Sequence, residues 1–158
     1  MGPFSVRYYR KSSDKDFISN EVKKDDVRKY LAINGSETIE SLITEDAWHL
    51  NLVVTNNCDE PIGFVTCRLV GRSGMVYIGR ILVSKHYRGN GVGTILLKHL
   101  EKLTEECWNV SGYYGLTIEN KSMEKFFEKA GYKNSGTYKA FTYRAGKMCD
   151  QTLFNRFI

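Results

Sequence analysis

The spacing of apolar residues along the chain predicts strands and helices in a mixed order. Alternating apolar and polar positions, typical of strands, cover residues 4–10, 48–55, 61–70, 75–83, 136–144 and 147–157. Helical spacing covers one or two short helices between residues 14 and 33, a stretch from residue 36 or 37 to 43, and a longer helix after the glycines at 89–93 that ends near residue 106. Polar residues at 56–60 and the pair Ala145-Gly146 predict hairpin turns.

The order of these elements predicts an α/β fold with a mixed sheet. It runs strand, helices, three antiparallel strands, helix, strand, helix and a closing hairpin. The longest helix has an apolar stripe, and we expect it to bury Ile95, Leu96, Leu97, Leu100 and Leu103. A chain of 158 residues is long enough for one covered core, so we expect residues 1–158 to form a single domain.

A strand, a glycine-rich turn and a helix follow one another around residue 90. The strand ends at Ile81-Leu82-Val83, and the helix is entered through Arg88-Gly89-Asn90-Gly91-Val92-Gly93-Thr94. The first N–H groups of a helix have no partners inside it, and the helix dipole adds partial positive charge there. Glycines let the main chain approach a phosphate closely. This segment therefore predicts a site for a phosphorylated ligand.

The glycine spacing excludes two common phosphate-binding motifs and matches a third. No Lys-Ser or Lys-Thr pair follows the glycines, as a P-loop requires, and their spacing by two fails the dinucleotide pattern Gly-x-Gly-x-x-Gly. The arrangement Arg88-x-x-Gly91-x-Gly93 closely resembles motif A of the GCN5-related N-acetyltransferase (GNAT) superfamily, which binds the pyrophosphate of acetyl-coenzyme A (acetyl-CoA). The resemblance implies the cofactor-binding residues Leu82, Val83, Arg88, Gly89, Asn90, Gly91, Val92, Gly93 and Thr94.

A second block, residues 116–132, supports the same resemblance. It reads as a strand, an Asn at a turn, a short helix and a glycine that ends the helix. It is similar to the superfamily signature Asn-x-x-x-x-x-Phe-Tyr-Glu-Lys-x-Gly-Phe, which here begins at Asn120 and ends at Tyr132. The resemblance implies that Asn120, Ser122 and Phe127 contact the cofactor. Asn is also a preferred helix N-cap, and Asn120 can serve in both ways.

The resemblance also implies the fold and the route of the reaction. The GNAT fold has a central, mostly antiparallel twisted sheet of about seven strands, flanked by about four helices. Its fourth and fifth strands splay apart and admit the cofactor. An amine must lose a proton before it attacks the thioester, and a backbone amide of the fourth strand, here Leu82 or Val83, stabilises the oxyanion.

The groups that move protons do not follow from the motifs. The family commonly has Tyr where this chain has Phe127, and Phe cannot donate a proton. The strand 75–83 also lacks the carboxylate that many members carry. The remaining candidates for catalysis are Glu119 as a base, with Tyr132, Tyr138, Tyr143 or solvent near the cofactor sulfur. A chain of water molecules is the alternative base.

Composition narrows the partners. The net charge of +5 suits a ligand with several phosphates but is not concentrated enough to predict a nucleic-acid surface. The cysteines, at 58, 67, 107 and 149, and the three histidines fit no metal spacing, so we expect no metal. Reduced thiols, no apolar run of membrane-spanning length and no leader-like segment favour a cytoplasmic protein.

The acceptor amine stays open at this point. The closing segment 141–154 is similar to the hairpin of the branch that contains ribosomal-protein and spermidine N-acetyltransferases. This implies a primary amine on a protein N-terminus or lysine, a polyamine or an amino sugar, and allows a homodimer. Two other functions stay open for this chain: a catalytically silent acetyl-CoA-binding regulatory module, and a toxin that acetylates charged tRNA.

Overall fold

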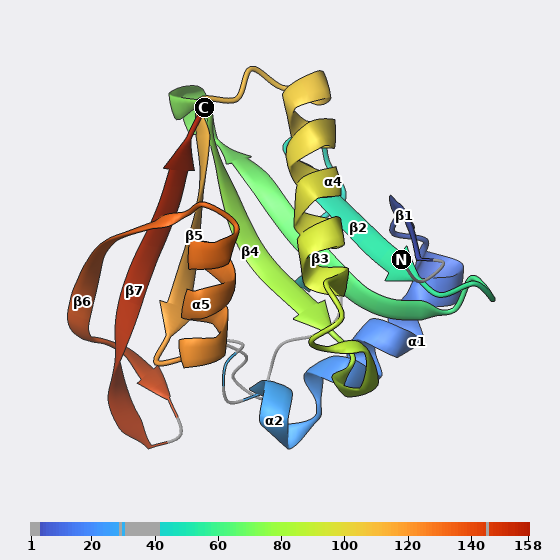
Figure 1. Cartoon of the computed structure of the whole chain (residues 1–158), viewed down its shortest axis with the longest axis horizontal. Helices are drawn as coiled ribbons and strands as arrows, with labels where there is room; N and C mark the ends of the chain where they lie inside the picture. The colour runs from blue at the N-terminus through green and yellow to red at the C-terminus, as the bar shows by residue number, and fades with distance from the viewer. Residues whose placement is uncertain (1–3, 29, 31–41, 145) are drawn as a thin grey trace.

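The computed structural model describes residues 4–28, 30, 42–144 and 146–158, which form one seven-stranded sheet with helices on both faces (Figure 1). The strands are β1 (Ser5–Tyr8), β2 (His49–Thr55), β3 (Pro61–Val70), β4 (Met75–Val83), β5 (Gly112–Ile118), β6 (Lys133–Arg144) and β7 (Lys147–Phe157). The helices are α1 (Lys11–Val22), α2 (Asp25–Arg28), α4 (Val92–Cys107) and α5 (Lys121–Lys129), with the short 3₁₀ turns η1 (Gly71–Ser73) and η2 (Lys85–Tyr87).

The sheet order is β1-β2-β3-β4-β5-β7-β6. All neighbours run antiparallel except β4 and β5, which are parallel because α4 carries the chain back to the starting edge. The hairpin between β2 and β3 is closed by Asn56, whose Oδ1 accepts from the N–H groups of Cys58 and Glu60 at 2.9 and 3.0 Å. This is the local turn that an Asn favours, and it agrees with the turn predicted at 56–60.

Two apolar clusters fill the two faces of the sheet. On one face, α4 and α5 cover a cluster that includes Leu96, Tyr113 and Phe154. On the other face, α1 and α2 cover a cluster that includes Ile18, Phe64 and Leu82. In Figure 1 the first pair of helices lies in front of the sheet. We call these the α4 face and the α1 face.

The parallel pair β4–β5 separates partway along its length. Residues Met75 to Ile78 of β4 pair with Gly112 to Gly115 of β5, and no later residues of the two strands pair. Just beyond the last pair, β4 carries a bulge at Gly79, because Thr66 and Cys67 of β3 lie opposite Arg80 and Ile78. The two strands therefore diverge toward their carboxyl ends, as Figure 1 shows. We call the space between them the gap.

The predicted fold class is confirmed, with small corrections to individual elements. The first strand covers only Ser5–Tyr8 of the predicted 4–10, and β6 begins at Lys133, three residues before the prediction. In α4 the fully buried apolar residues are Val92, Leu96, Leu97 and Leu100. Ile95 and Leu103, predicted to be buried, are only half-buried because they lie at the borders of the stripe.

One predicted helix falls mainly on residues that the structure does not describe. The stretch predicted from 36 or 37 to 43 overlaps the described part only at Leu42 and Ile43, and both are buried in the α1-face cluster. The end of the helical stretch predicted between residues 14 and 33 also lies outside the described residues, apart from residue 30. Within the described part of the chain, no helix is both long and apolar enough to cross a membrane.

Candidate active site

The glycine-rich turn leads from the gap into α4. Gly91 is the N-cap of α4 with φ 76°, and Gly89 has φ 78°. A Cβ at either position would meet nothing within 4 Å, so these glycines are required by the backbone conformation and the space before them is open. The N–H of Ile95 is the one that bonds back to the Gly91 carbonyl at 3.0 Å. The amides of Val92, Gly93 and Thr94 precede it and point out of the helix, as an anion site requires.

The gap-facing amide at the end of β4 belongs to Val83. The N–H of Ser84 donates to Ile62 on β3 at 2.8 Å, and the N–H directions alternate along a strand. The N–H of Leu82 therefore points to β3, opposite Phe64, while that of Val83 points into the gap. Of the two predicted oxyanion donors, the geometry favours Val83. Leu82 instead contributes its buried side chain to the α1-face cluster.

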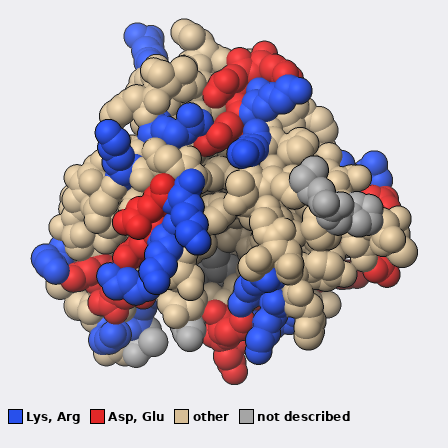
Figure 2. Space-filling model, viewed as in Figure 1, with Lys and Arg blue, Asp and Glu red and all other residues tan. Residues whose placement is uncertain are grey.

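A groove runs between α5 and the start of α4. A Cβ on Gly93 would lie 3.2 Å from Cε2 of Phe126 on α5, a tight contact that would require the ring to move by a few tenths of an ångström. Figure 2 shows that the surface is hollowed between α5 and the N-terminal part of α4, in front of the diverging strands. A chain-like ligand with its phosphates at α4 could extend along this groove into the gap.

We call the Phe127 ring the floor of the gap, because it lies over Gly115, the residue at which the pairing of β5 with β4 ends. Its side chain is 2% exposed and stacks on Phe154 of β7, with ring centroids 5.7 Å apart and an interplanar angle of 14°. A Cβ on Gly115 would be 2.4 Å from Cζ of this ring. Phe127 is thus an apolar wall at the point where the strands separate.

Asn120 and Ser122 lie at the start of α5, next to the groove. Oδ1 of Asn120 accepts from the N–H of Met123 at 3.2 Å, so this residue is the N-cap of α5. Capping uses only the oxygen of the amide, and its NH₂ group can donate to a ligand. Ser122 is exposed in the first turn. Gly131 ends the helix with φ 87°, as the sequence predicts.

Glu119, the candidate base, is held by neighbours from β7. Its Oε2 accepts from Lys147 Nζ at 3.1 Å and its Oε1 from the N–H of Asp150 at 3.3 Å. The hydrogen bond from Lys147 is the main cause that lowers the pKa of this carboxyl below its ordinary value. A carboxylate with a lowered pKa is a weak base for an ammonium group. Its φ of 45° marks a tight turn between β5 and α5.

Tyr132 does not reach the gap. Its side chain is 2% exposed, and its hydroxyl donates to Glu101 Oε1 at 2.8 Å. Glu101 lies in the second half of α4, on the order of 10 Å along the helix from its start. Burial, with the nearby Glu101 charge, raises the pKa of the Tyr132 phenol. The expectation that Tyr132 meets the cofactor sulfur stays a prediction; in this structure its hydroxyl joins α4 to the end of α5.

Tyr138 lies on β6, on the α1 face of the sheet. It pairs with Gln151 of β7, which pairs with Ile118 at the end of β5. Cross-strand partners share a face of the sheet. Tyr113 lies on the α4 face, and alternation along β5 places Ile118 on the opposite face, the α1 face. Tyr138, the partner of its partner, therefore lies on the α1 face as well. The Tyr138 ring is 51% exposed and its centroid is 5.2 Å from that of Phe141. Of Tyr132 and Tyr138, Tyr138 is the one with an exposed hydroxyl-bearing ring.

Arg88 contacts the end of β4 and helix α2. Its Nε donates to the Val83 carbonyl at 2.8 Å, and its Nη1 donates to Asp26 Oδ2 at 3.0 Å. The sequence pattern identified Arg88 but not Asp26, because the two residues are 62 positions apart. Phe126 and Gly115 were also not singled out, since only packing across α4, α5 and β5 gives them a place at the groove and the gap.

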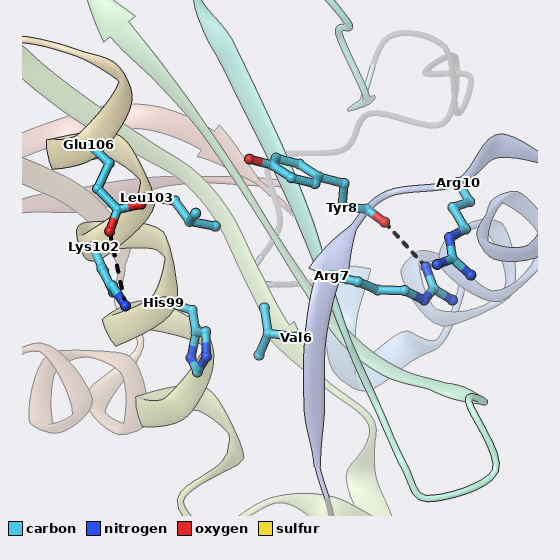
Figure 3. A pocket seen from close by; sticks show the side chains of 8 residues that line it. All are labelled: Val6, Arg7, Tyr8, Arg10, His99, Lys102, Leu103 and Glu106. Atoms are coloured by element: carbon cyan, nitrogen blue, oxygen red, sulfur yellow. Dashed lines mark hydrogen bonds and ion pairs between the residues drawn. The ribbon is translucent and has the colours of Figure 1, made fainter.

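Two further hollows lie away from the gap. Figure 3 shows one of about 470 Å³ between β1 and the second half of α4, where Lys102 pairs with Glu106 at 4.0 Å and Arg7 donates to the Tyr8 carbonyl. The other, of about 500 Å³, lies behind η2 against α1 and α2 and includes Glu21, Asp26 and His86. Neither includes the glycines of the turn. Within the described residues, no three His, Cys, Asp or Glu side chains group as metal ligands.

A parallel strand pair that opens beside a glycine-lined helix start is the arrangement that the sequence resemblance implies. The model of the acetyltransferase (GNAT) family matches residues 16–132. The chain therefore belongs to this family, which confirms the resemblance in its sequence. No curated protein matches the chain as a whole.

Solved structures of this fold resemble the whole chain at low identity. An acetyltransferase from Salmonella typhimurium that modifies the N-terminal serine of ribosomal protein L7/L12 has TM-score 0.83 and 14% identity, over 100% of this chain and 96% of that one. Spermidine N-acetyltransferase from Vibrio cholerae, with CoA and spermine, has TM-score 0.84 and 17% identity, over 98% and 95%. Arabidopsis thaliana NAA60 with a bisubstrate analogue has TM-score 0.80 and 20% identity, over 98% of each chain. At these identities they support the fold alone.

Proposed function

We propose that this chain is a single-domain N-acetyltransferase that moves an acetyl group from acetyl-CoA to a primary amine. The observation that carries the proposal is the continuity of three features. Outward-pointing amides at the start of α4 lead to a groove beside Phe126, and the groove leads to a gap that the amide of Val83 faces. Pyrophosphate, pantetheine and thioester have this order along acetyl-CoA.

The reaction needs the amine and the thioester to meet in the gap. The neutral amine nitrogen attacks the thioester carbon, the Val83 N–H donates to the developing oxyanion, and the carbon–sulfur bond breaks. Water takes the proton from the amine, since Glu119 is bound to Lys147 and Asp150. The thiolate leaves with little help, because its pKa is near 8.5, or takes a proton from solvent or Tyr138.

The acceptor approaches from the α1 face. The cofactor groove is on the α4 face, so the gap can be reached by a second substrate only from the other side, where α2 and Tyr138 lie. Protein N-termini or lysines, polyamines and amino sugars all carry the required amine. The similar structures include enzymes whose names state an N-terminal serine and spermidine as acceptors.

A catalytically silent acetyl-CoA-binding module is the second candidate. Phe127 provides no proton at the floor of the gap, and β4 carries no carboxylate between Met75 and Val83. Such a module would bind acetyl-CoA and release no thiol with any amine. A tRNA-acetylating toxin is favoured less, because Figure 2 shows lysines and arginines interspersed with carboxylates on this face instead of one basic surface.

Thiol release separates these candidates. Purified protein with acetyl-CoA should release CoA on addition of an amine from a panel of short peptides, spermidine, glucosamine and charged tRNA. Release with an amine supports the enzyme. Binding of acetyl-CoA without release with every amine supports the silent module, and release with charged tRNA alone supports the toxin.

A pair of variants at Gly91 tests the phosphate site. Asn and Asp both tolerate the left-handed backbone that Gly91 adopts, and they differ only in charge. We expect Gly91→Asp to weaken acetyl-CoA binding by roughly ten- to hundredfold relative to Gly91→Asn, since a like charge about 5 Å from phosphate costs about 1–3 kcal/mol. Titration calorimetry measures both constants. Equal affinities for the two variants would place the phosphates elsewhere.

A further inference from the structure

The side chain of Arg88 is directed back toward β4 and α2. Its Nε donates to the Val83 carbonyl at 2.8 Å, and its Nη1 donates to Asp26 Oδ2 at 3.0 Å. The sequence motif alone implies that this arginine serves the pyrophosphate. A guanidinium that is paired with a carboxylate contributes less positive charge to a nearby anion than a free one does.

The carbonyl that Arg88 holds belongs to the peptide edge of β4 that faces the gap. The N–H and the carbonyl of one residue point to the same edge of a strand, so Val83 presents both away from β3. Pairing with β5 ends at Ile78, five residues before Val83, and β5 does not hold this part of the edge. The side chain of Arg88 therefore holds the last peptide of β4, the one next to the glycine-rich turn.

The other end of Arg88 is attached to a helix on the acceptor side. Asp26 lies in α2, and the neighbouring Val27 is 4% exposed and packs in the same cluster as Leu82. Leu82 precedes Val83 on β4. Helix α2 is thus joined to the end of β4 twice, through apolar packing behind the strand and through Arg88 beside it.

We propose that Arg88 is a positioning residue that braces α2 against the gap-facing edge of β4, while the main-chain amides of residues 89–94 hold the phosphates. The inference rests on the proposed function and adds a role for α2 in placing the acceptor. The Arg88 and Asp26 side chains are 43% and 42% exposed, so the ion pair by itself is weak. We expect the ion pair to act by fixing the relative positions of β4, α2 and the turn that carries Arg88.

Three single variants and one double variant test this role. Arg88→Gln and Asp26→Asn each remove the brace, and Lys85→Gln removes a neighbouring positive charge that acts on Asp26 through space but leaves both hydrogen bonds of Arg88 in place. We expect the first two to raise the KM for the acceptor amine about fivefold, with the Kd for acetyl-CoA changed by less than about twofold. The double variant should match either single variant, because both remove one interaction.

Hydrogen–deuterium exchange gives a readout that needs no turnover. Amides of residues 25–28 and 83–84 should exchange faster in Arg88→Gln and Asp26→Asn, and at the wild-type rate in Lys85→Gln. If Arg88→Gln weakens acetyl-CoA binding tenfold and Asp26→Asn tightens it, Arg88 is a phosphate ligand and the brace is refuted. Unchanged exchange in both variants refutes it as well. Faster exchange without turnover of any amine would refute only the proposed activity.

Discussion

Single glycines decide where the substrate can lie. Gly89 and Gly91 adopt a left-handed backbone in front of open space, so they shape the turn. Gly93 and Gly115 have ordinary backbone angles and leave room for the rings of Phe126 and Phe127 respectively. The sequence motif contains the first three, whereas the role of Gly115 follows only from its position under α5.

Substitution of Gly115 tests the floor of the gap. In Gly115→Ala the new Cβ would lie 2.4 Å from Phe127 Cζ, and the ring has no free space because Tyr132 and Phe154 pack against it. We expect a loss of about 1–3 kcal/mol in the free energy of unfolding, as for other overpacked cores. Denaturant unfolding measures it.

The control for Gly115→Ala is Phe127→Leu, which replaces the ring that the new Cβ would meet by a smaller side chain. If the clash causes the loss, Gly115→Ala combined with Phe127→Leu should be more stable than the sum of the two single effects. Strict additivity would show that the two positions do not touch in this way.

At the scale of elements, we propose that the start of α5 serves both stability and binding. Asn120 caps the helix through its oxygen, which leaves its NH₂ group next to the groove. The start of α4 is similar. Its first backbone N–H groups have no hydrogen-bond acceptor inside the helix, and they face the open space before Gly91. In both helices the end that lies beside the gap is the one left to a ligand.

Two variants of Asn120 separate the two uses. Asn120→Asp keeps the capping oxygen and removes the NH₂ donor, so we expect wild-type thermal stability and acetyl-CoA binding weakened several-fold. Asn120→Ala should lose both, with about 1 kcal/mol of stability. Thermal unfolding and titration calorimetry are the measurements. Wild-type affinity in Asn120→Asp would limit this residue to capping.

Elements are also where sequence prediction did best. The bounds of β3, β4 and β7 agree with the prediction, because each strand carries a run of apolar residues that ends at turn residues. In β4 buried and half-buried positions alternate, whereas β3 is buried on both faces from Ile62 to Cys67. The start of β6 was missed because residues 133–141 are exposed on both sides and give no apolar alternation. Its length is set by pairing with β7.

At the scale of the whole molecule, partly or fully buried ion pairs join different elements of the fold. Arg156 of β7 binds Glu101 of α4 at 2.9 Å, and its guanidinium lies over the ring of Tyr113 at 5.3 Å. On the other side, Arg7 of β1 donates to both carboxylate oxygens of Asp14 in α1 at 2.7 and 2.9 Å. Such pairs cost stability when one partner is lost.

The pair Arg7–Asp14 gives the fold a defined acid sensitivity. Burial alone would raise the pKa of Asp14, but hydrogen bonds from Arg7 and the Arg10 N–H outweigh it and place the pKa below the ordinary 3.8. A carboxyl with a lowered folded pKa stabilises the fold above 3.8, and this contribution is lost as the pH falls through the folded pKa.

We expect Asp14→Asn to lower the free energy of unfolding at pH 7 by about 3 kcal/mol and to reduce the acid dependence of stability below pH 4. Thermal unfolding between pH 7 and pH 2.5 measures both effects. Asp59, which also binds Arg7 but has a side chain that is 64% exposed, is the control. Asp59→Asn should cost less than about 1 kcal/mol. Equal effects of the two variants would contradict a special role for the buried carboxylate.

The sequence by itself determined the order of elements, the glycine-rich turn and the family. Each of these is local, because it depends on spacing within a few turns of one strand or helix. The tertiary structure decided which gap-facing amide is available, that Tyr132 binds Glu101, and that Arg88 meets Asp26. These depend on strand register and on contacts between residues far apart in the chain, which no local pattern encodes.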